Sequence, residues 1–182
     1  MIDENNTIIK KFDFGEYVGE LRNDKREGKG IMYYTNGDRY EGEWKNDKIE
    51  GKGIYYFNNN NRYEGDFKAG KREGKGIMNY SGGDKYEGEW KNDKREGRGI
   101  MYYSIGIKYE GEWKNSNKEG KGIIYYNDGN YEGDFKNDKK DGKGIYYYNN
   151  GNREMGNYSK GEKKGKHVTL NEDGHIHSKY YY

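Results

Sequence analysis

The sequence predicts an all-β protein, an elongated single-layer antiparallel meander of stacked β-hairpins. Three observations predict it. A Tyr-x-Gly pattern returns about every 23 residues along nearly the whole chain. Inside each repeat, large and polar residues alternate with period two, the period of a strand and not of a helix. Segments rich in Asn, Asp and Gly favour tight turns between these runs, and they leave no room for helical crossovers.

The repeat is read from tyrosines with successive spacings of 23, 23, 23, 23 and 22 residues, namely Tyr17, Tyr40, Tyr63, Tyr86, Tyr109 and Tyr131. A seventh, degenerate unit starts at Glu154. Self-similarity at a fixed period indicates units that each pack only against their neighbours. We therefore predict a lead-in over residues 1–16 that contributes a half-repeat strand, an array of seven units over 17–176, and a C-terminal tail over 177–182.

Each unit is expected to be one hairpin. In the first unit we predict a strand over 17–22, a loop over 23–27 with the sequence NDKRE, a second strand over 28–34 and a turn over 35–38. Seven such units give about fourteen strands. Since consecutive hairpins need no crossover, a meander is the simplest topology.

The predicted core consists of aromatic residues and glycines that share one face. Glycine inside a strand lowers its stability unless another side chain covers the bare backbone. A register with Trp44 opposite Gly53 and Gly42 opposite Tyr55 would provide that cover, although only the facing parity follows firmly from the pattern. The structural repeat core is Tyr40, Gly42, Trp44, Gly51, Gly53, Tyr63, Gly65, Phe67, Tyr86, Gly88, Trp90, Gly97, Gly99, Tyr109, Gly111 and Trp113.

Composition excludes several classes of protein. The chain has no Cys, which excludes a disulfide framework, a thiol nucleophile and cysteine-ligated zinc. Its 34 basic and 32 acidic residues leave a net charge of +2, so we expect no nucleic-acid partner. No segment approaches the ~20 apolar residues of a membrane span, and residues 1–10 lack the pattern of a secretory signal. We expect a cytoplasmic protein.

The pattern Tyr-x-Gly-x-Trp/Phe followed by Gly-x-Gly, seen in Tyr40-Gly42-Trp44 and Gly51-Gly53, closely resembles the MORN repeat. The resemblance implies an elongated single-layer sheet and a non-catalytic scaffold or adaptor that holds proteins in cytoskeletal, ciliary or membrane-associated assemblies. The chain departs from the family where a loop Gly is common; those positions carry Asp24, Asp47, Asp93, Ser116 and Asp138.

No constellation of catalytic residues recurs along the chain, and we expect no enzyme, no cofactor and no metal. The Gly-x-Gly pairs lie between strand halves and precede no helix, so they do not indicate a phosphate loop. The histidines are His167, His175 and His177. His175 and His177 would share one strand face and could ligate a metal, but a solvated terminal cap is the simpler interpretation.

The opposite face of the second strands is also apolar, and it is the candidate partner surface. Its residues are Ile54, Tyr56, Ile77, Ile100, Tyr102, Ile123, Tyr125, Ile145 and Tyr147. One interpretation is β propensity, with these side chains packing along their own column beside Glu20, Glu43 and Glu89. The other is a contiguous apolar column that binds a partner protein, or a second copy as a homodimer.

Basic residues recur in the predicted loops, as in Lys25-Arg26, Lys71-Arg72, Lys94-Arg95, Lys139-Lys140 and Lys163-Lys164 with Lys166. A line of cations would favour weak contact with an anionic phosphoinositide membrane, but the neighbouring Asp24, Glu27, Asp93 and Glu96 oppose it. A regulatory subunit for an enzyme encoded elsewhere is a further alternative.

Small-angle scattering tests the array. A compact globule of this length has a radius of gyration of about 16 Å. We expect a clearly larger value, because a single layer of stacked hairpins does not close around one core. A measured value near the compact one would contradict the predicted single-layer array.

Overall fold

Residues 8–182 are described by a computed structural model, and they form sixteen antiparallel strands in an open sheet of hairpins. The described chain contains no helix, and therefore no helix that crosses a membrane. Strand order follows chain order. These features confirm the predicted all-β meander of hairpins. The chain is divided into two compact units, the first ending at Lys94 and the second beginning at Arg95.

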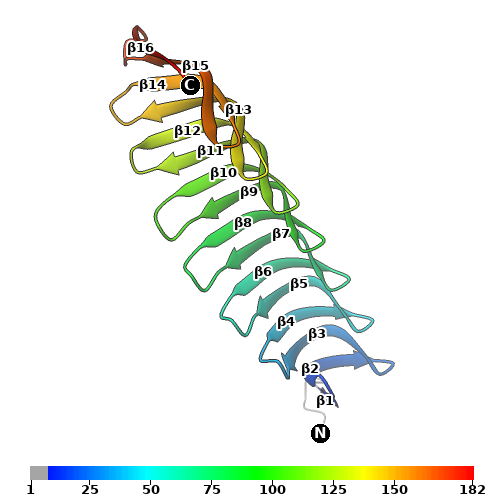
Figure 1. Cartoon of the computed structure of the whole chain (residues 1–182). Coiled ribbons are helices and arrows are strands. Elements are labelled where there is room, and N and C mark those ends of the chain that lie inside the picture. Colours follow the sequence, from blue (N-terminus) through cyan, green and yellow to red (C-terminus); the bar gives the residue numbers. More distant parts are fainter. Residues whose placement is uncertain (1–7) are drawn as a thin grey trace. The chain divides into compact units, whose positions relative to one another are not determined.

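Figure 1 shows the hairpins of each unit following one another, with strands bent into arcs. The first unit holds β1 (Ile8–Phe12), β2 (Gly15–Arg22), β3 (Lys25–Tyr34), β4 (Arg39–Lys45), β5 (Lys48–Tyr56), β6 (Arg62–Lys68), β7 (Lys71–Asn79) and β8 (Lys85–Lys91). The second begins one residue into β9 (Lys94–Tyr102) and holds β10 (Lys108–Lys114), β11 (Asn117–Tyr126), β12 (Gly129–Lys136), β13 (Lys139–Tyr148), β14 (Arg153–Ser159), β15 (Glu162–Leu170) and β16 (Ile176–Tyr181).

Two of these strands lie at the ends of the described chain. β1 falls in the segment predicted as a lead-in, and it pairs with β2 from Ile8 opposite Gly19 to Phe12 opposite Gly15. β16 covers most of the segment predicted as a tail and pairs with β15, with Tyr180 opposite His167. Regular pairing therefore reaches further toward both ends than the fourteen strands counted from the repeats.

The predicted five-residue loop over 23–27 is wrong, because β3 already begins at Lys25. Asn23 and Asp24 take φ values of 50° and 62°, the signature of a two-residue type I′ turn. Asp47, Asp93, Ser116 and Asp138 have positive φ at the equivalent turn position. The turn thus keeps its left-handed conformation without the glycine that the family often has there.

The predicted register is also wrong, although its parity is right. Gly42 lies opposite Gly53, and Trp44 lies opposite Ile49 on β5 and opposite Gly28 on β3. A bulge between Gly42 and Trp44 shifts the pairing, and Gly51 at φ 66° supplies the left-handed residue. The tight turn and the bulge together produce this register, and period-two alternation alone reveals neither.

Tyrosine rings, and not tryptophan rings, cover these paired glycines. Tyr40 is fully buried, and a Cβ atom at Gly42 or Gly53 would collide with its side chain. Its hydroxyl donates to the backbone carbonyl of Glu43 at 3.0 Å. Burial raises the pKa of the equivalent Tyr17 to about 12, because it disfavours the charged phenolate. Full burial is shared by Tyr17, Tyr63, Tyr86, Tyr109 and Tyr131.

Each tryptophan packs on the hairpin that precedes it. Trp44 Nε1 donates to the carbonyl of Gly30 at 3.2 Å, and the rings of Tyr17 and Tyr40 meet it edge-on at 5.4 and 5.3 Å. Trp90 repeats this bond to Gly76 at 3.1 Å. The tryptophan therefore joins neighbouring hairpins.

An arginine completes this junction. The Arg26 guanidinium lies 4.3 Å from the Trp44 ring, and its Nε is 3.1 Å from Asp47 Oδ1. Asp47 N donates to the carbonyl of Arg26 at 3.1 Å. The same arrangement joins Arg72 to Trp90 and Asp93, and Arg95 to Trp113 and Ser116. In the second repeat the position equivalent to Arg26 is Ile49. The turn that faces it carries Gly70, whose N donates to the Ile49 carbonyl at 2.8 Å.

Replacing Trp90 by Ala should lower the free energy of unfolding by about 3 kcal/mol, as for other buried aromatic residues. The change removes the ring that Arg72 covers and the bond to Gly76. Urea unfolding of the purified chain measures it. Trp90→Phe is the matched control, because Phe67 and Phe135 occupy the same repeat position and are buried there. An unchanged midpoint for Trp90→Ala would show that the ring does not stabilise the sheet.

Candidate interaction surface

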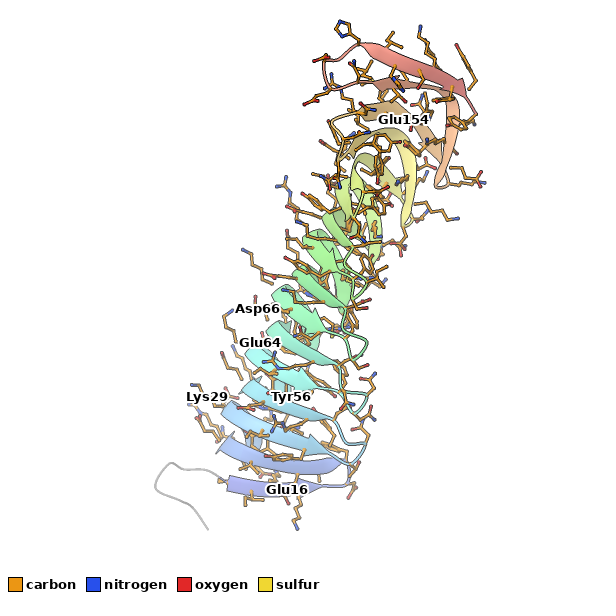
Figure 2. All side chains as sticks on the ribbon, turned by 90° about the vertical axis from the view of Figure 1, so that its left-hand side faces the viewer. Glu16, Lys29, Tyr56, Glu64, Asp66 and Glu154 are labelled. Carbon is orange, nitrogen blue, oxygen red and sulfur yellow. The ribbon has the colours of Figure 1, made fainter. Side chains whose placement is uncertain are left out.

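The sheet has two chemically different faces. The aromatic face carries the buried tyrosines, tryptophans and glycines described above. We call the opposite side the charged face; Figure 2 labels Lys29, Tyr56, Glu64 and Asp66 on it. Among residues 8–182 neither a helix nor a second sheet covers this face. Its side chains are therefore available to a partner that spans several repeats.

The isoleucines of the candidate partner surface do not form a contiguous column, so that expectation is wrong. Ile54 lies between Glu41 and Glu64, because every second strand of the repeat alternates with a glutamate-bearing first strand. Ile123 likewise lies between Glu110 and Glu132. The neighbouring acids are therefore these glutamates, and not Glu20, Glu43 and Glu89 as expected from the sequence.

A second row on the charged face alternates tyrosines with cations. Tyr56 lies between Arg39 and Arg62, whose guanidinium carbons are 4.1 and 5.7 Å from its ring. Lys108 Nζ is 3.8 Å from the Tyr125 ring. Such cation–π contacts stabilise a cation over an aromatic ring by about 0.5–1 kcal/mol at exposed sites. The cations also bond to the glutamate row, as in the 2.6 Å pair between Arg62 and Glu64.

The predicted partner residues are partly accessible. All are half-buried except Tyr147, which is 39% exposed, and the half-buried set is Ile54, Tyr56, Ile77, Ile100, Tyr102, Ile123, Tyr125 and Ile145. The predicted core residues lie on the other face, and their aromatic members are buried, namely Tyr40, Trp44, Tyr63, Phe67, Tyr86, Trp90, Tyr109 and Trp113. The charged face is thus amphipathic, with apolar patches set in a lattice of paired charges.

The basic pairs predicted in loops have mostly structural contacts. The arginines at positions 26, 72 and 95 cover tryptophan rings, and Lys140 Nζ lies 4.1 Å from the Tyr131 ring. The acids beside them are also engaged: Glu27 Oε2 accepts a hydrogen bond from Asn46 N at 2.9 Å. Arg26, Arg72, Arg95 and Lys140 are therefore engaged in packing, whereas Lys25 and Lys71 remain exposed beside the turns.

Exposed cations flank the two-residue turns, and of these the sequence analysis singled out Lys71 but not Lys45, Lys48 or Lys68. Lys45 lies opposite Lys48, and Lys68 opposite Lys71, at the last pair of each ladder before the turn. All four side chains are exposed. The sequence contains these pairs as Lys on both sides of a two-residue turn, in KNDK and KAGK. They can be recognised only when the turn is known to have two residues.

The repeat now has a defined geometry: a hairpin with a type I′ turn, a glycine bulge and a tyrosine that covers two glycines. The MORN repeat model matches six successive segments with this geometry, residues 17–39, 40–62, 63–85, 86–108, 109–130 and 131–153. The chain belongs to the MORN repeat family. No curated protein matches it.

Solved structures give only distant similarities. The TCP10 domain of Danio rerio CPAP is 11% identical, with a TM-score of 0.28, and the match covers 100% of this chain and 99% of that one. The same domain in complex with a peptide of Danio rerio STIL is 14% identical, also at 0.28, with 97% and 99% covered. At this TM-score the likeness carries no information on function.

Beyond the sixth MORN repeat, a histidine takes over the role of the buried tyrosine. His167 is fully buried, and its ring blocks the space above Gly156. Its Nδ1 is 3.0 Å from Glu154 Oε1 and its Nε2 is 2.8 Å from the carbonyl of Asn157. His175 and His177 are exposed. Residues 8–182 contain no group of three or more His, Cys, Asp or Glu placed to hold a metal ion.

The carboxylate of Glu154, labelled in Figure 2, is the centre of this cluster. Burial alone would raise its pKa, but the Lys163 ammonium at 2.6 Å and the Tyr148 hydroxyl at 2.8 Å outweigh burial and lower the pKa below its usual 4.5. A lowered carboxyl pKa stabilises the fold above the unfolded pKa. That stability is lost as the pH falls through the folded pKa.

Acid unfolding of the chain tests this cluster. Below about pH 4.5 we expect the stability of the C-terminal hairpins to decline, partly because Glu154 binds a proton on unfolding. Glu154→Gln should lower stability at pH 7 and flatten the decline between that pH and the acid range. Chemical denaturation at several pH values measures both. An unaltered slope in Glu154→Gln would show that this carboxylate does not contribute to the acid transition.

Proposed function

We propose that this MORN-repeat chain is a non-catalytic scaffold or adaptor that binds partner proteins through the charged face of its sheet. The observation that carries the proposal is the repeated row of half-buried isoleucines and tyrosines on a face that no other described element covers. Desolvated aromatic and aliphatic anchors inside a polar surround are typical of protein interfaces.

The arrangement of charges on this face supports a protein partner. Isoleucine anchors lie beside acids, as Ile123 does between Glu110 and Glu132, and tyrosine anchors lie beside cations, as Tyr125 does opposite Lys108. A partner would have to match this alternation, and such complementarity sets register and suppresses wrong partners. Because glutamates recur beside the isoleucines, the face offers no uniform positive surface to an anionic membrane.

A cytoplasmic location, in a cytoskeletal or ciliary setting, is part of this proposal and rests on the family resemblance. Binding of phosphoinositide membranes and regulation of a separate enzyme are the competing roles. In the first case the purified chain would bind lipid vesicles. In the second case it would bind one enzyme and change the activity of that enzyme.

A double substitution tests the charged face without disturbing its ladder. Ile123→Lys would place a cation between Glu110 and Glu132, and Tyr125→Glu would place an acid opposite Lys108. Both changes remove an apolar anchor and add a favourable cross-strand charge pair, so the fold should persist. We expect the double variant to lose the proteins that copurify with the native chain, as quantified by mass spectrometry.

The conservative pair Ile123→Val with Tyr125→Phe is the matched control and should retain those proteins. Circular dichroism should show strand content in both variants. If the double variant keeps its partners, or if the chain sediments with anionic vesicles and the double variant does so equally, protein binding through this face is contradicted.

A further inference from the structure

Three pairs of like charge lie along one edge of the first unit, the edge formed by its two-residue turns. Arg22 lies opposite Lys25, and the two lysine pairs at Lys45–Lys48 and Lys68–Lys71 follow on the next hairpins. Directly opposite residues of an antiparallel ladder share one face. We call these six side chains the cationic edge.

The cationic edge has no internal partner. No ion pair, hydrogen bond or ring contact joins any of its six side chains to another residue within the described 8–182. Like charges directly opposite each other destabilise a sheet. Three unrelieved pairs on successive hairpins indicate a surface shaped for something other than stability.

The acids that could neutralise this edge are already bonded elsewhere. Asp24 pairs with Lys10 at 2.7 Å, and Asp47 with Arg26 at 3.1 Å. Glu50 Oε2 accepts a hydrogen bond from Ala69 N at 2.9 Å. In the bulges, Glu43 Oε1 accepts one from Lys52 N at 3.2 Å. These carboxylates hold the turns and bulges, and they are not directed at the edge lysines.

The geometry points to an acidic segment of a partner protein as the occupant: we propose that the cationic edge binds a peptide in the polyproline II conformation with an acidic residue at every third position. Neighbouring hairpins are about 9.6 Å apart at ~4.8 Å per strand. A peptide in the polyproline II conformation returns every third side chain to the same side, and three residues at ~3.1 Å each span about 9.3 Å. One carboxylate can therefore meet each cation pair in turn. The inference rests on the proposed protein-binding role and names the chemistry of one bound segment.

The second unit offers an internal contrast. Its equivalent turn-flanking pairs are Lys114–Asn117, Lys136–Lys139 and Ser159–Glu162. Only the middle pair is doubly cationic, so a segment with regular acidic spacing would find a matching series in the first unit alone. An anionic membrane or a disordered polyanion needs no fixed spacing, whereas the proposed peptide does.

Fluorescence anisotropy with a defined probe tests the proposal on the full chain. The probe is a fluorescein-labelled peptide of about five Glu-Thr-Ser units, long enough at ~3.1 Å per residue to reach all three pairs. Replacing Lys45, Lys48, Lys68 and Lys71 by Gln should weaken binding about tenfold or more, and binding should fall as salt is raised. Lys136→Gln with Lys139→Gln is the matched control and should change it by less than about twofold.

Stability gives the second readout. Because the four lysines repel each other across the ladder, the quadruple Gln variant should unfold at an equal or higher urea midpoint while it loses the peptide. The Ile123→Lys, Tyr125→Glu variant should still bind the peptide, which separates failure of this proposal from failure of the charged-face proposal. Equal binding of a peptide with its glutamates clustered, tighter binding of phosphatidylserine vesicles or of oligothymidylate, or a lowered midpoint in the quadruple variant would overturn the proposal.

Discussion

The fold depends on a tyrosine ring lying along its own strand above two paired glycines. In a single-layer sheet there is no second layer against which an aromatic residue can be buried, yet Tyr40 and its equivalents are fully buried. The bare backbone of Gly42 and Gly53 provides the space, and the Tyr40 hydroxyl reaches the carbonyl of Glu43. The tyrosine is thus buried within one layer, because the ring packs against the backbone of the sheet that carries it.

Cohesion between hairpins comes from a second set of contacts at the turn edge. The indole of Trp44 reaches back to Gly30, Arg26 covers the indole, and Asp47 holds the arginine. Every one of these contacts crosses from one hairpin to the next. A lone hairpin is only marginally stable in water. Each repeat is therefore stabilised more by its junctions with neighbouring hairpins than by the pairing of its own two strands.

The periodicity of the sequence was sufficient to predict the hairpins, the facing parity and the aromatic face. Register was not predictable from alternation, because it depends on left-handed residues at Asn23, Asp24 and Gly28 that create a tight turn and a bulge. The role of Arg26 was missed because a basic residue beside a turn is usually solvated. The sequence predicted a solvated cap around His167. Its burial was not predictable, because it depends on a contact with Glu154 that alternation does not reveal.

The junction contacts also specify which hairpins can pack beside each other. Arg26 faces a turn that carries Asp47, whereas Ile49 faces a turn that carries Gly70. Near-identical repeats can pair out of order during folding, and one skipped hairpin would leave Arg26 against a glycine turn and without its carboxylate. The small departures from the consensus therefore restrict which hairpins can pack next to each other with all junction contacts formed.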